Sequence, residues 1–119
     1  MRTYLIESQS IFIPFLRGIL EHVGCDVIAT SRVVDLVDIA ENAPSTVFVD
    51  VDYLHQSGPT MLCRIRETAR SATLIALSEI DDALFAATCI VSGASAVCSK
   101  TNDTEKFTKS VRGFLVKAS

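Results

Sequence analysis

The stretch VFVDVDYLHQSG, from Val47 to Gly58, decides the fold class of this chain. Its first residues are β-branched or aromatic with no polar residue between them, which is typical of a strand covered on both faces. Two aspartates, Asp50 and Asp52, end the run, and a glycine follows. A buried strand that ends on carboxylates indicates a chemical use for this edge of the sheet, and it raises the question of which aspartate serves that use.

The size and composition of the chain describe one globular domain over residues 1–119. Apolar residues make up 49% of the sequence, enough for a core without metals or disulfides. The net charge is −3 and the basic residues are scattered, which argues against nucleic-acid binding by this domain. The sequence shows neither an apolar run of membrane-spanning length nor a signal peptide. These features favour a cytoplasmic protein that binds neither nucleic acid nor membrane.

The cysteines also favour a cytoplasmic protein. None is spaced as Cys-x-x-Cys, and most lie inside apolar runs, which favours reduced core residues over a disulfide or metal framework. The four are Cys25, Cys63, Cys89 and Cys98.

Strand-like and helix-like segments alternate along the whole chain. Between the short apolar runs, apolar residues recur at three-to-four spacing, which is typical of amphipathic helices. The predicted strands cover residues 3–6, 25–29, 46–49, 73–77 and 95–98.

The predicted helices carry signals at their ends. Pro14 falls at the edge of the first turn of the first helix, so we expect a delayed or irregular start there. Asn102 and Glu105 form a capping box for the last helix. The other predicted limits are Thr30 or Ser31 at the start of the second helix, Gly58-Pro59 at the start of the third, Asp81 or Asp82 at the start of the fourth, and Gly24 and Gly93 at the ends of the first and fourth.

Five strand–helix units in strict alternation predict an α/β fold. Each crossover is right-handed and must cover a face of the sheet, so we expect a five-stranded parallel sheet with helices on both faces. Ligands of such sheets bind beyond the carboxyl ends of the strands. Here those ends carry Glu7, Asp50, Ser78 and Lys100, which should meet in one pocket. No Gly-rich phosphate loop accompanies them, which argues against nucleotide binding.

At these positions the chain resembles the receiver domain of bacterial two-component response regulators. The resemblance covers essentially the whole chain and implies the flavodoxin-like strand order 2-1-3-4-5. The family pattern is an acidic pair after the first strand, an acceptor aspartate at the end of the third with a glycine eight residues later, Thr or Ser after the fourth, Gly-Ala, and a lysine after the fifth. The matching residues are Glu7-Ser8, Asp50, Gly58, Ser78, Gly93-Ala94 and Lys100.

The resemblance implies that Asp50 is a phosphoacceptor, whose carboxylate attacks phosphorus and forms an aspartyl phosphate. Lys100 would supply a fixed cation, and Ser78 would donate a hydrogen bond to the phosphoryl group. A Mg²⁺ ion would neutralise further charge. Glu7 and Asp50 are its expected ligands, with Asp52 a weaker candidate because residues two apart on a strand point to the same side. The new charge would then bias a nearby loop and the last helices between two arrangements.

The implied partners are a histidine kinase or a phosphotransfer protein as donor, and a downstream protein whose binding is switched. In this interpretation the chain is a signalling module and not an enzyme. The fourth helix, fifth strand and last helix also carry small and apolar residues. Part of them must be core, and the remainder allow for a homodimer or partner surface. They are Ala83, Ala86, Ala87, Val97 and Val111.

Some positions depart from the family pattern. Ser8 replaces the second acid, which predicts weaker Mg²⁺ binding than in receivers with a full acidic pair. Val97 replaces the switch aromatic, and Leu54 and Thr101 stand where prolines are common. These departures favour an alternative, a pseudo-receiver that keeps the fold as a protein-interaction module and is phosphorylated poorly or not at all. The retained acceptor, hydroxyl and lysine favour the phosphoacceptor.

Each of these residues also has a purely structural interpretation. Asp50 and Asp52 could be a solvated strand end, Lys100 a solvated lysine and Ser78 a locally satisfied hydroxyl. Only their common register favours the functional interpretation. His22 and His55 have no partner residues for catalysis or metal binding and are expected at the surface, and an unrelated flavodoxin-like enzyme is disfavoured because no nucleophile–base pair is visible.

Overall fold

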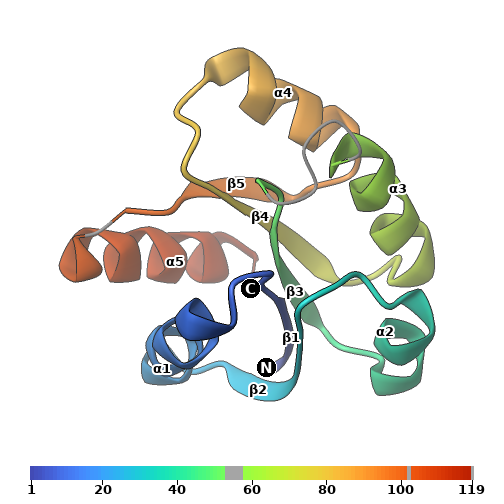
Figure 1. Ribbon diagram of the computed structural model, residues 1–119, viewed down its shortest axis with the longest axis horizontal. Coiled ribbons are helices and arrows are strands. Elements are labelled where there is room, and N and C mark those ends of the chain that lie inside the picture. The colour runs from blue at the N-terminus through green and yellow to red at the C-terminus, as the bar shows by residue number, and fades with distance from the viewer. Residues whose placement is uncertain (53–57, 102, 119) are drawn as a thin grey trace.

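The computed structural model describes residues 1–52, 58–101 and 103–118. These residues form a five-stranded parallel sheet in the order β2-β1-β3-β4-β5, with helices on both faces (Figure 1). The predicted α/β class and the order 2-1-3-4-5 are confirmed. The strands are β1 (Arg2–Ile6), β2 (Asp26–Ser31), β3 (Thr46–Asp50), β4 (Thr73–Ser78) and β5 (Ala96–Ser99). The helices are the 3-10 turn η1 (Ser10–Phe12), α1 (Ile13–His22), α2 (Leu36–Asn42), α3 (Gly58–Thr68), α4 (Ala83–Val91) and α5 (Thr104–Ala118).

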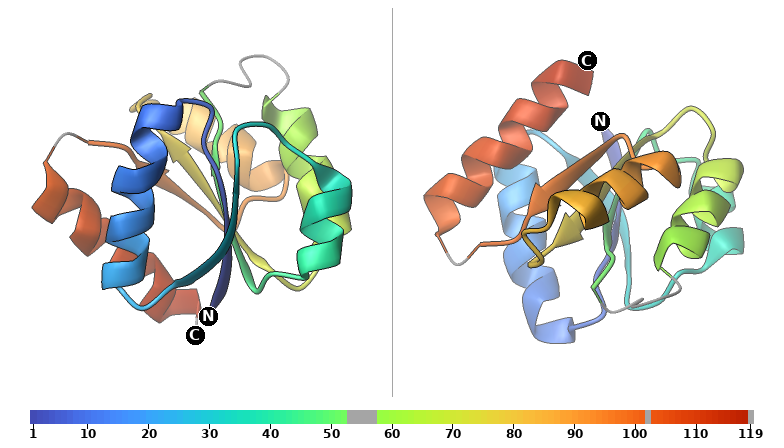
Figure 2. Two further views of the ribbon diagram at one scale, coloured as in Figure 1. Left: turned by 60° about the horizontal axis from the view of Figure 1, so that its bottom comes forward. Right: turned by 90° about the horizontal axis from the view of Figure 1, so that it is seen from above.

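The sheet lies between two helical layers, with α1 and α5 on one face and α2, α3 and α4 on the other (Figure 2). The central strand β3 is buried along its whole length, as its apolar run predicts. Its side chains alternate between the layers, since Phe48 packs in the cluster of α1 and α5 whereas Val47 and Val49 pack in the cluster of α2 and α3. This two-sided packing fixes the carboxyl end of β3, at Asp50, in the middle of the sheet edge.

The second helix begins later than the sequence predicts. Thr30 and Ser31, the predicted caps, belong to β2 and pair with the end of β1. The cap is Asp35, whose carboxylate accepts a hydrogen bond from a backbone N–H group three residues later at 3.0 Å. The prediction was wrong because strand pairing with β1 uses the backbone groups of Thr30 and Ser31, and this tertiary pairing outweighs their local capping preference.

The limits of α1 and α4 fit the predictions. Pro14 lies in the first turn of α1, directly after the 3-10 turn η1, which is the irregular start that we expected. Gly24 and Gly93 follow α1 and α4 with positive φ angles of 99° and 124°, as helix-ending glycines require. Asp82 caps α4 and accepts backbone N–H groups of its first turn. Asn102, half of the predicted capping box, lies outside the described residues, and the cap of α5 is Asp103, whose carboxylate accepts the Lys106 N–H at 3.1 Å.

The structure also tests what the sequence predicts for the cysteines and for membrane-spanning segments. All four cysteines are free, and Cys25, Cys89 and Cys98 are buried while Cys63 is exposed. The prediction of reduced core residues therefore holds for three of the four. Within the described ranges, no helix combines the length and the apolar character needed to cross a membrane.

Candidate functional site

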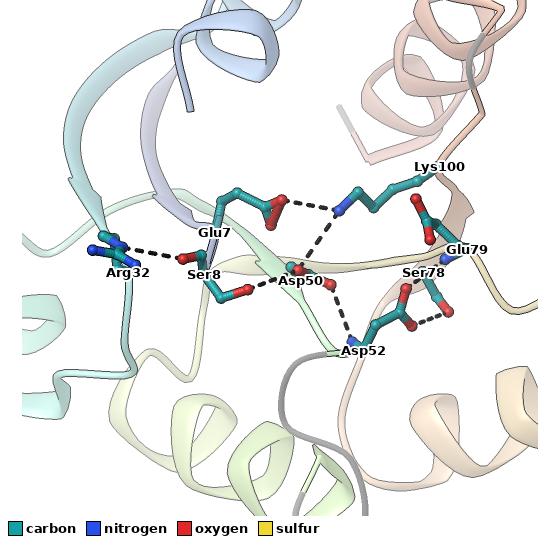
Figure 3. A network of polar contacts seen from close by, with 8 residues as sticks. All are labelled: Glu7, Ser8, Arg32, Asp50, Asp52, Ser78, Glu79 and Lys100. Carbon is teal, nitrogen blue, oxygen red and sulfur yellow. Dashed lines mark hydrogen bonds and ion pairs between the residues drawn. The ribbon is translucent and has the colours of Figure 1, made fainter. Parts of the chain in front are cut away.

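The carboxyl ends of four strands bring the predicted residues to one edge of the sheet (Figure 3). Asp50 is the last residue of β3 and Ser78 the last of β4, whereas Glu7 and Lys100 directly follow β1 and β5. The parallel register aligns these ends, because the end of β3 pairs with β4 and Ser78 pairs with the last residue of β5. The structure therefore gathers all four residues into one site, and Asp52 lies beside them.

Lys100 lies between the two carboxyl groups of the pocket. Its Nζ is 2.9 Å from Glu7 Oε1 and 3.6 Å from Asp50 Oδ2. Glu7 is fully buried and Asp50 is 4% exposed, so both ion pairs lie mostly out of water. The ammonium also stands 5.5 Å from the centre of the Phe12 ring. The backbone N–H of Lys100 donates to the carbonyl of Ser78 at 2.7 Å, which fixes the base of the lysine side chain to β4.

Burial changes the acid–base chemistry of this pair. Burial, followed by the neighbouring Asp50 carboxyl, raises the pKa of Glu7 to about 7, while Lys100 opposes the rise. Burial alone would lower the pKa of Lys100, but its hydrogen bond to Glu7 and the charges of Asp50 and Glu7 outweigh burial and raise that pKa. Lys100 is therefore held as a cation beside Asp50, whereas the raised pKa of Glu7 lies near neutral pH.

One oxygen of the pocket has no hydrogen-bond partner among the residues that the structure describes. Glu7 Oε2 is buried without one in the part of the chain that the structure describes. Such an oxygen, next to a second carboxyl, calls for a proton or a cation. Two carboxylates are also within the number that Mg²⁺ uses when waters complete its coordination. Glu7 and Asp50 thus fit a Mg²⁺ ion, although no set of three or more His, Cys, Asp or Glu residues suited to a metal occurs among the described residues.

The side of the pocket opposite Lys100 carries Ser8 and not a second acid. Its hydroxyl lies 3.4 Å from Asp50 Oδ2, where it donates a long hydrogen bond. Arg32, from the connection between β2 and α2, donates through Nε to the Ser8 carbonyl at 3.1 Å. Sequence reasoning missed Arg32, because no periodic pattern places a loop residue at this rim.

Asp52 does not direct its carboxylate at Asp50. Its Oδ1 accepts the Ser78 hydroxyl at 2.5 Å and its Oδ2 accepts the Glu79 N–H at 2.7 Å (Figure 3). The Asp52 N–H donates to Asp50 Oδ1 at 3.0 Å. Sequence reasoning missed the hydrogen bonds of the Asp52 side chain with Ser78 and Glu79. Strand periodicity does not place this side chain, because β3 ends at Asp50.

The remaining predicted positions are peripheral to this network. Val97, at the position of the switch aromatic, is half-buried against the core. Ala94 is buried behind the turn at Gly93. Leu54 and His55 lie outside the described residues.

Comparison with known proteins identifies the family of this arrangement. Residues 4–112 match the family model described as the response regulator receiver domain. None of the curated proteins compared with the chain matches it significantly.

Several solved structures share the fold. The CheX–CheY–BeF3–Mg²⁺ complex from Borrelia burgdorferi gives a TM-score of 0.80 at 19% identity, covering 97% of this chain and 89% of that chain. The signal receiver domain of NarL from Mycobacterium tuberculosis gives 0.80 at 17% identity, covering 98% and 94%. A response regulator from Thermotoga maritima gives 0.78 at 18% identity, covering 97% of each chain. These likenesses concern the fold, whereas the family model matches most of the sequence. The chain therefore belongs to the response regulator receiver domain family, in which phosphorylation and switching are typical.

Proposed function

We propose that this chain is a phosphoacceptor: Asp50 takes a phosphoryl group from a histidine kinase or a phosphotransfer protein and thereby switches the binding of a downstream protein. The observation that carries the proposal is the Lys100 ammonium, held 2.9 Å from Glu7 and 3.6 Å from Asp50. Phosphoryl transfer spreads negative charge over the equatorial oxygens, and a cation already fixed beside the acceptor stabilises that charge without reorganisation. A cytoplasmic location and a signalling role without enzymatic turnover belong to the same proposal.

The two oxygens of Asp50 have different roles in this proposal. Oδ1 accepts the Asp52 N–H at 3.0 Å, which orients the carboxylate. Oδ2 faces Lys100 at 3.6 Å and is the oxygen that attacks phosphorus. As the new O–P bond forms, the bond between phosphorus and the donor breaks, and the donor atom keeps its electron pair. Lys100 stays protonated throughout and follows the transferred charge.

Glu7 and Asp50 would hold Mg²⁺ in this site, and the ion would supply further neutralisation of the phosphoryl oxygens. Glu7 must be ionised for that task, so its proton leaves when the ion binds. Ser8 contributes only a neutral hydroxyl, so we propose that the ion binds more weakly than in receivers with a full acidic pair. Asp52 remains a weaker candidate ligand, and its carboxylate would have to leave Ser78 and Glu79 to take part.

Intact mass spectrometry tests the proposal. The full chain is incubated with acetyl phosphate and Mg²⁺, and the wild type should gain the mass of one phosphoryl group. Asp50→Asn should abolish the gain because the nucleophile is lost, whereas Asp52→Asn should retain it. A gain that disappears only in Asp52→Asn would move the acceptor by two residues. A wild type that never gains the mass would refute the proposal and favour the pseudo-receiver.

A further inference from the structure

Two hydrogen-bond donors at the end of β4 converge on one carboxylate. The Ser78 hydroxyl and the Glu79 N–H donate to the two oxygens of Asp52 at 2.5 Å and 2.7 Å (Figure 3). A hydroxyl next to a backbone N–H is a suitable pair of donors for any anion with two free oxygens, including a phosphoryl group. In this structure an internal anion fills the pair.

The Ser78 hydroxyl has no spare proton for a second acceptor. Its oxygen also accepts the Ile80 N–H at 2.9 Å, which leaves its one proton for Asp52. Ser78 is fully buried, so water does not offer an alternative partner. A phosphoryl group on Asp50 can therefore receive this hydrogen bond only if Asp52 gives it up.

Asp52 is tied to the acceptor by the backbone and not by a cation. Its N–H donates to Asp50 Oδ1, so a group added at Asp50 acts directly on the segment that carries Asp52. Lys100 makes its ion pairs with Glu7 and Asp50, and within the described ranges no basic side chain pairs with Asp52. Among the residues that the structure describes, two neutral donors hold the carboxylate in place.

From these contacts we propose that Asp52 is an internal competitor of the phosphoryl group for the donors of Ser78 and Glu79. The inference rests on the proposed function and names its regulation. When Asp50 carries a phosphoryl group, the added charge of about −1.5 to −2 repels the Asp52 carboxylate. The Ser78 hydrogen bond then passes from Asp52 to a phosphoryl oxygen, with no proton transferred. Asp52 thereby lowers the affinity of the unphosphorylated site for phosphoryl-like anions and couples phosphorylation to movement of its own side chain.

A purely structural role of Asp52 gives the opposite expectation. If Asp52 only fastened the end of β3 to the end of β4, its removal would loosen the donors and weaken anion binding. A competitor predicts tighter binding when it is removed. The direction of the change in anion affinity therefore distinguishes the two roles, even if replacing Asp52 also makes the protein less stable.

The experiment measures the affinity of the full chain for beryllofluoride, an analogue of the phosphoryl group, at saturating Mg²⁺ by isothermal titration calorimetry. Asp52→Ala should bind about tenfold tighter, the equivalent of about one net hydrogen bond. Asp52→Asn should show a smaller gain, because its amide oxygen still accepts one donor. Asp81→Ala removes an equally charged but exposed side chain from the connection after β4, and it should leave the affinity unchanged.

A double-mutant cycle tests whether the gain in affinity depends on the Ser78 hydroxyl. In a Ser78→Ala background the disputed hydroxyl is absent, so Asp52→Ala should give much less than the tenfold gain. Unchanged or weaker binding in both Asp52 variants overturns the competitor while leaving the phosphoacceptor intact. A gain of equal size in Asp81→Ala would also overturn it, since simple charge removal would then explain the effect. A wild type that neither binds beryllofluoride nor gains a phosphoryl mass would refute the proposed function and this inference together.

Discussion

The two oxygens of the buried Glu7 carboxyl have different surroundings. Oε1 receives the Lys100 ammonium at 2.9 Å, whereas Oε2 has no hydrogen-bond partner among the described residues. Burial raises the pKa of this group to about 7. The same carboxyl can therefore carry a proton or serve a cation, and the choice depends on the pH and on Mg²⁺.

We predict that Glu7 makes the metal-free protein less stable as the pH rises. The pKa of Glu7 in the folded state, about 7, lies above its ordinary value of 4.5. Its contribution to stability is therefore fully present below pH 4.5 and is lost as the pH rises through about 7. Urea unfolding of the wild type and of Glu7→Gln across this interval, without Mg²⁺, measures the difference. Identical pH profiles for the two proteins would contradict the prediction.

We predict that Ser8→Asp tightens Mg²⁺ binding by about tenfold or more, because it adds a hard, charged oxygen ligand beside Asp50. The same substitution should destabilise the metal-free protein, since it brings a further negative charge to within a few ångströms of Asp50. Titration of Mg²⁺ followed by backbone amide shifts near Asp50 gives the affinities. Ser8→Ala is the control and should bind about as the wild type does. A wild type that already binds as tightly as Ser8→Asp would show that Ser8 does not weaken the site.

At the scale of elements, one arginine holds the end of α3 against the turn between α4 and β5. The Arg66 guanidinium donates to the Gly93 carbonyl at 3.0 Å and to the Ser95 hydroxyl at 3.0 Å. It also donates to the Ala72 carbonyl at 2.6 Å. Gly93 has a φ of 124°, and a Cβ there would lie 2.9 Å from the Arg66 Cβ. The turn that leads into β5, and hence to Lys100, depends on this contact.

We predict that Gly93→Ala destabilises the protein by roughly 1–3 kcal/mol, because it combines an unfavourable φ with a steric clash. Gly18→Ala is the matched control, since Gly18 lies inside α1 and a Cβ there would have no neighbouring group within 4 Å. The control should be more stable than the wild type by about 0.5–1 kcal/mol through its better helix propensity. Denaturant unfolding of both variants measures the two changes. Equal effects of the same sign would show that the surroundings of Gly93 do not matter.

The elements differ in how far the sequence predicts them. The central strand was predictable because Val47, Phe48 and Val49 leave no polar face. The start of α2 was not, because Thr30 and Ser31 favour a cap locally while β1 draws them into the sheet. Local preference decides an element only where no distant strand competes for the same backbone groups.

At the scale of the whole molecule, α4 presents apolar side chains to solvent. Of the apolar residues that the sequence singles out here, Val111 belongs to the core and is fully buried, whereas Ala83 and Ala87 are exposed. Leu84 is 75% exposed and Val91 is 88% exposed. No residue of α4 carries a charge. An uncharged, apolar helix face of this kind is typical of a surface that another protein covers.

We predict that the chain self-associates through this face at high concentration, because burying Leu84 and Val91 against a second copy removes apolar area from water. Sedimentation velocity over a range of concentrations, with and without a phosphodonor, measures it. Leu84→Glu should shift the distribution toward monomer. Arg17→Glu is the control, because Arg17 lies on α1 on another face, and it should leave the distribution unchanged. A strict monomer at every concentration would count against the prediction.

The site was predictable in part from the topology of the whole molecule. Glu7, Asp50 and Lys100 meet because the carboxyl ends of parallel strands share one edge, and the alternation of elements was enough to infer that edge. The direction of the Asp52 side chain was not predictable in this way. It depends on how the chain continues beyond the end of β3, where periodicity no longer applies.

The ion pair between Lys100 and Glu7 joins residues 93 positions apart, and this spacing has a consequence in time. At about 5–20 residues per second, a ribosome adds Lys100 roughly 5 to 19 seconds after Glu7. During that interval a nascent chain that has already paired β1 with β3 holds an acid that lacks its permanent counterion. The pocket becomes electrostatically complete only when β5 is in place, so the strand that follows all the other pocket residues in the sequence is also the one that brings the counterion to Glu7 and Asp50.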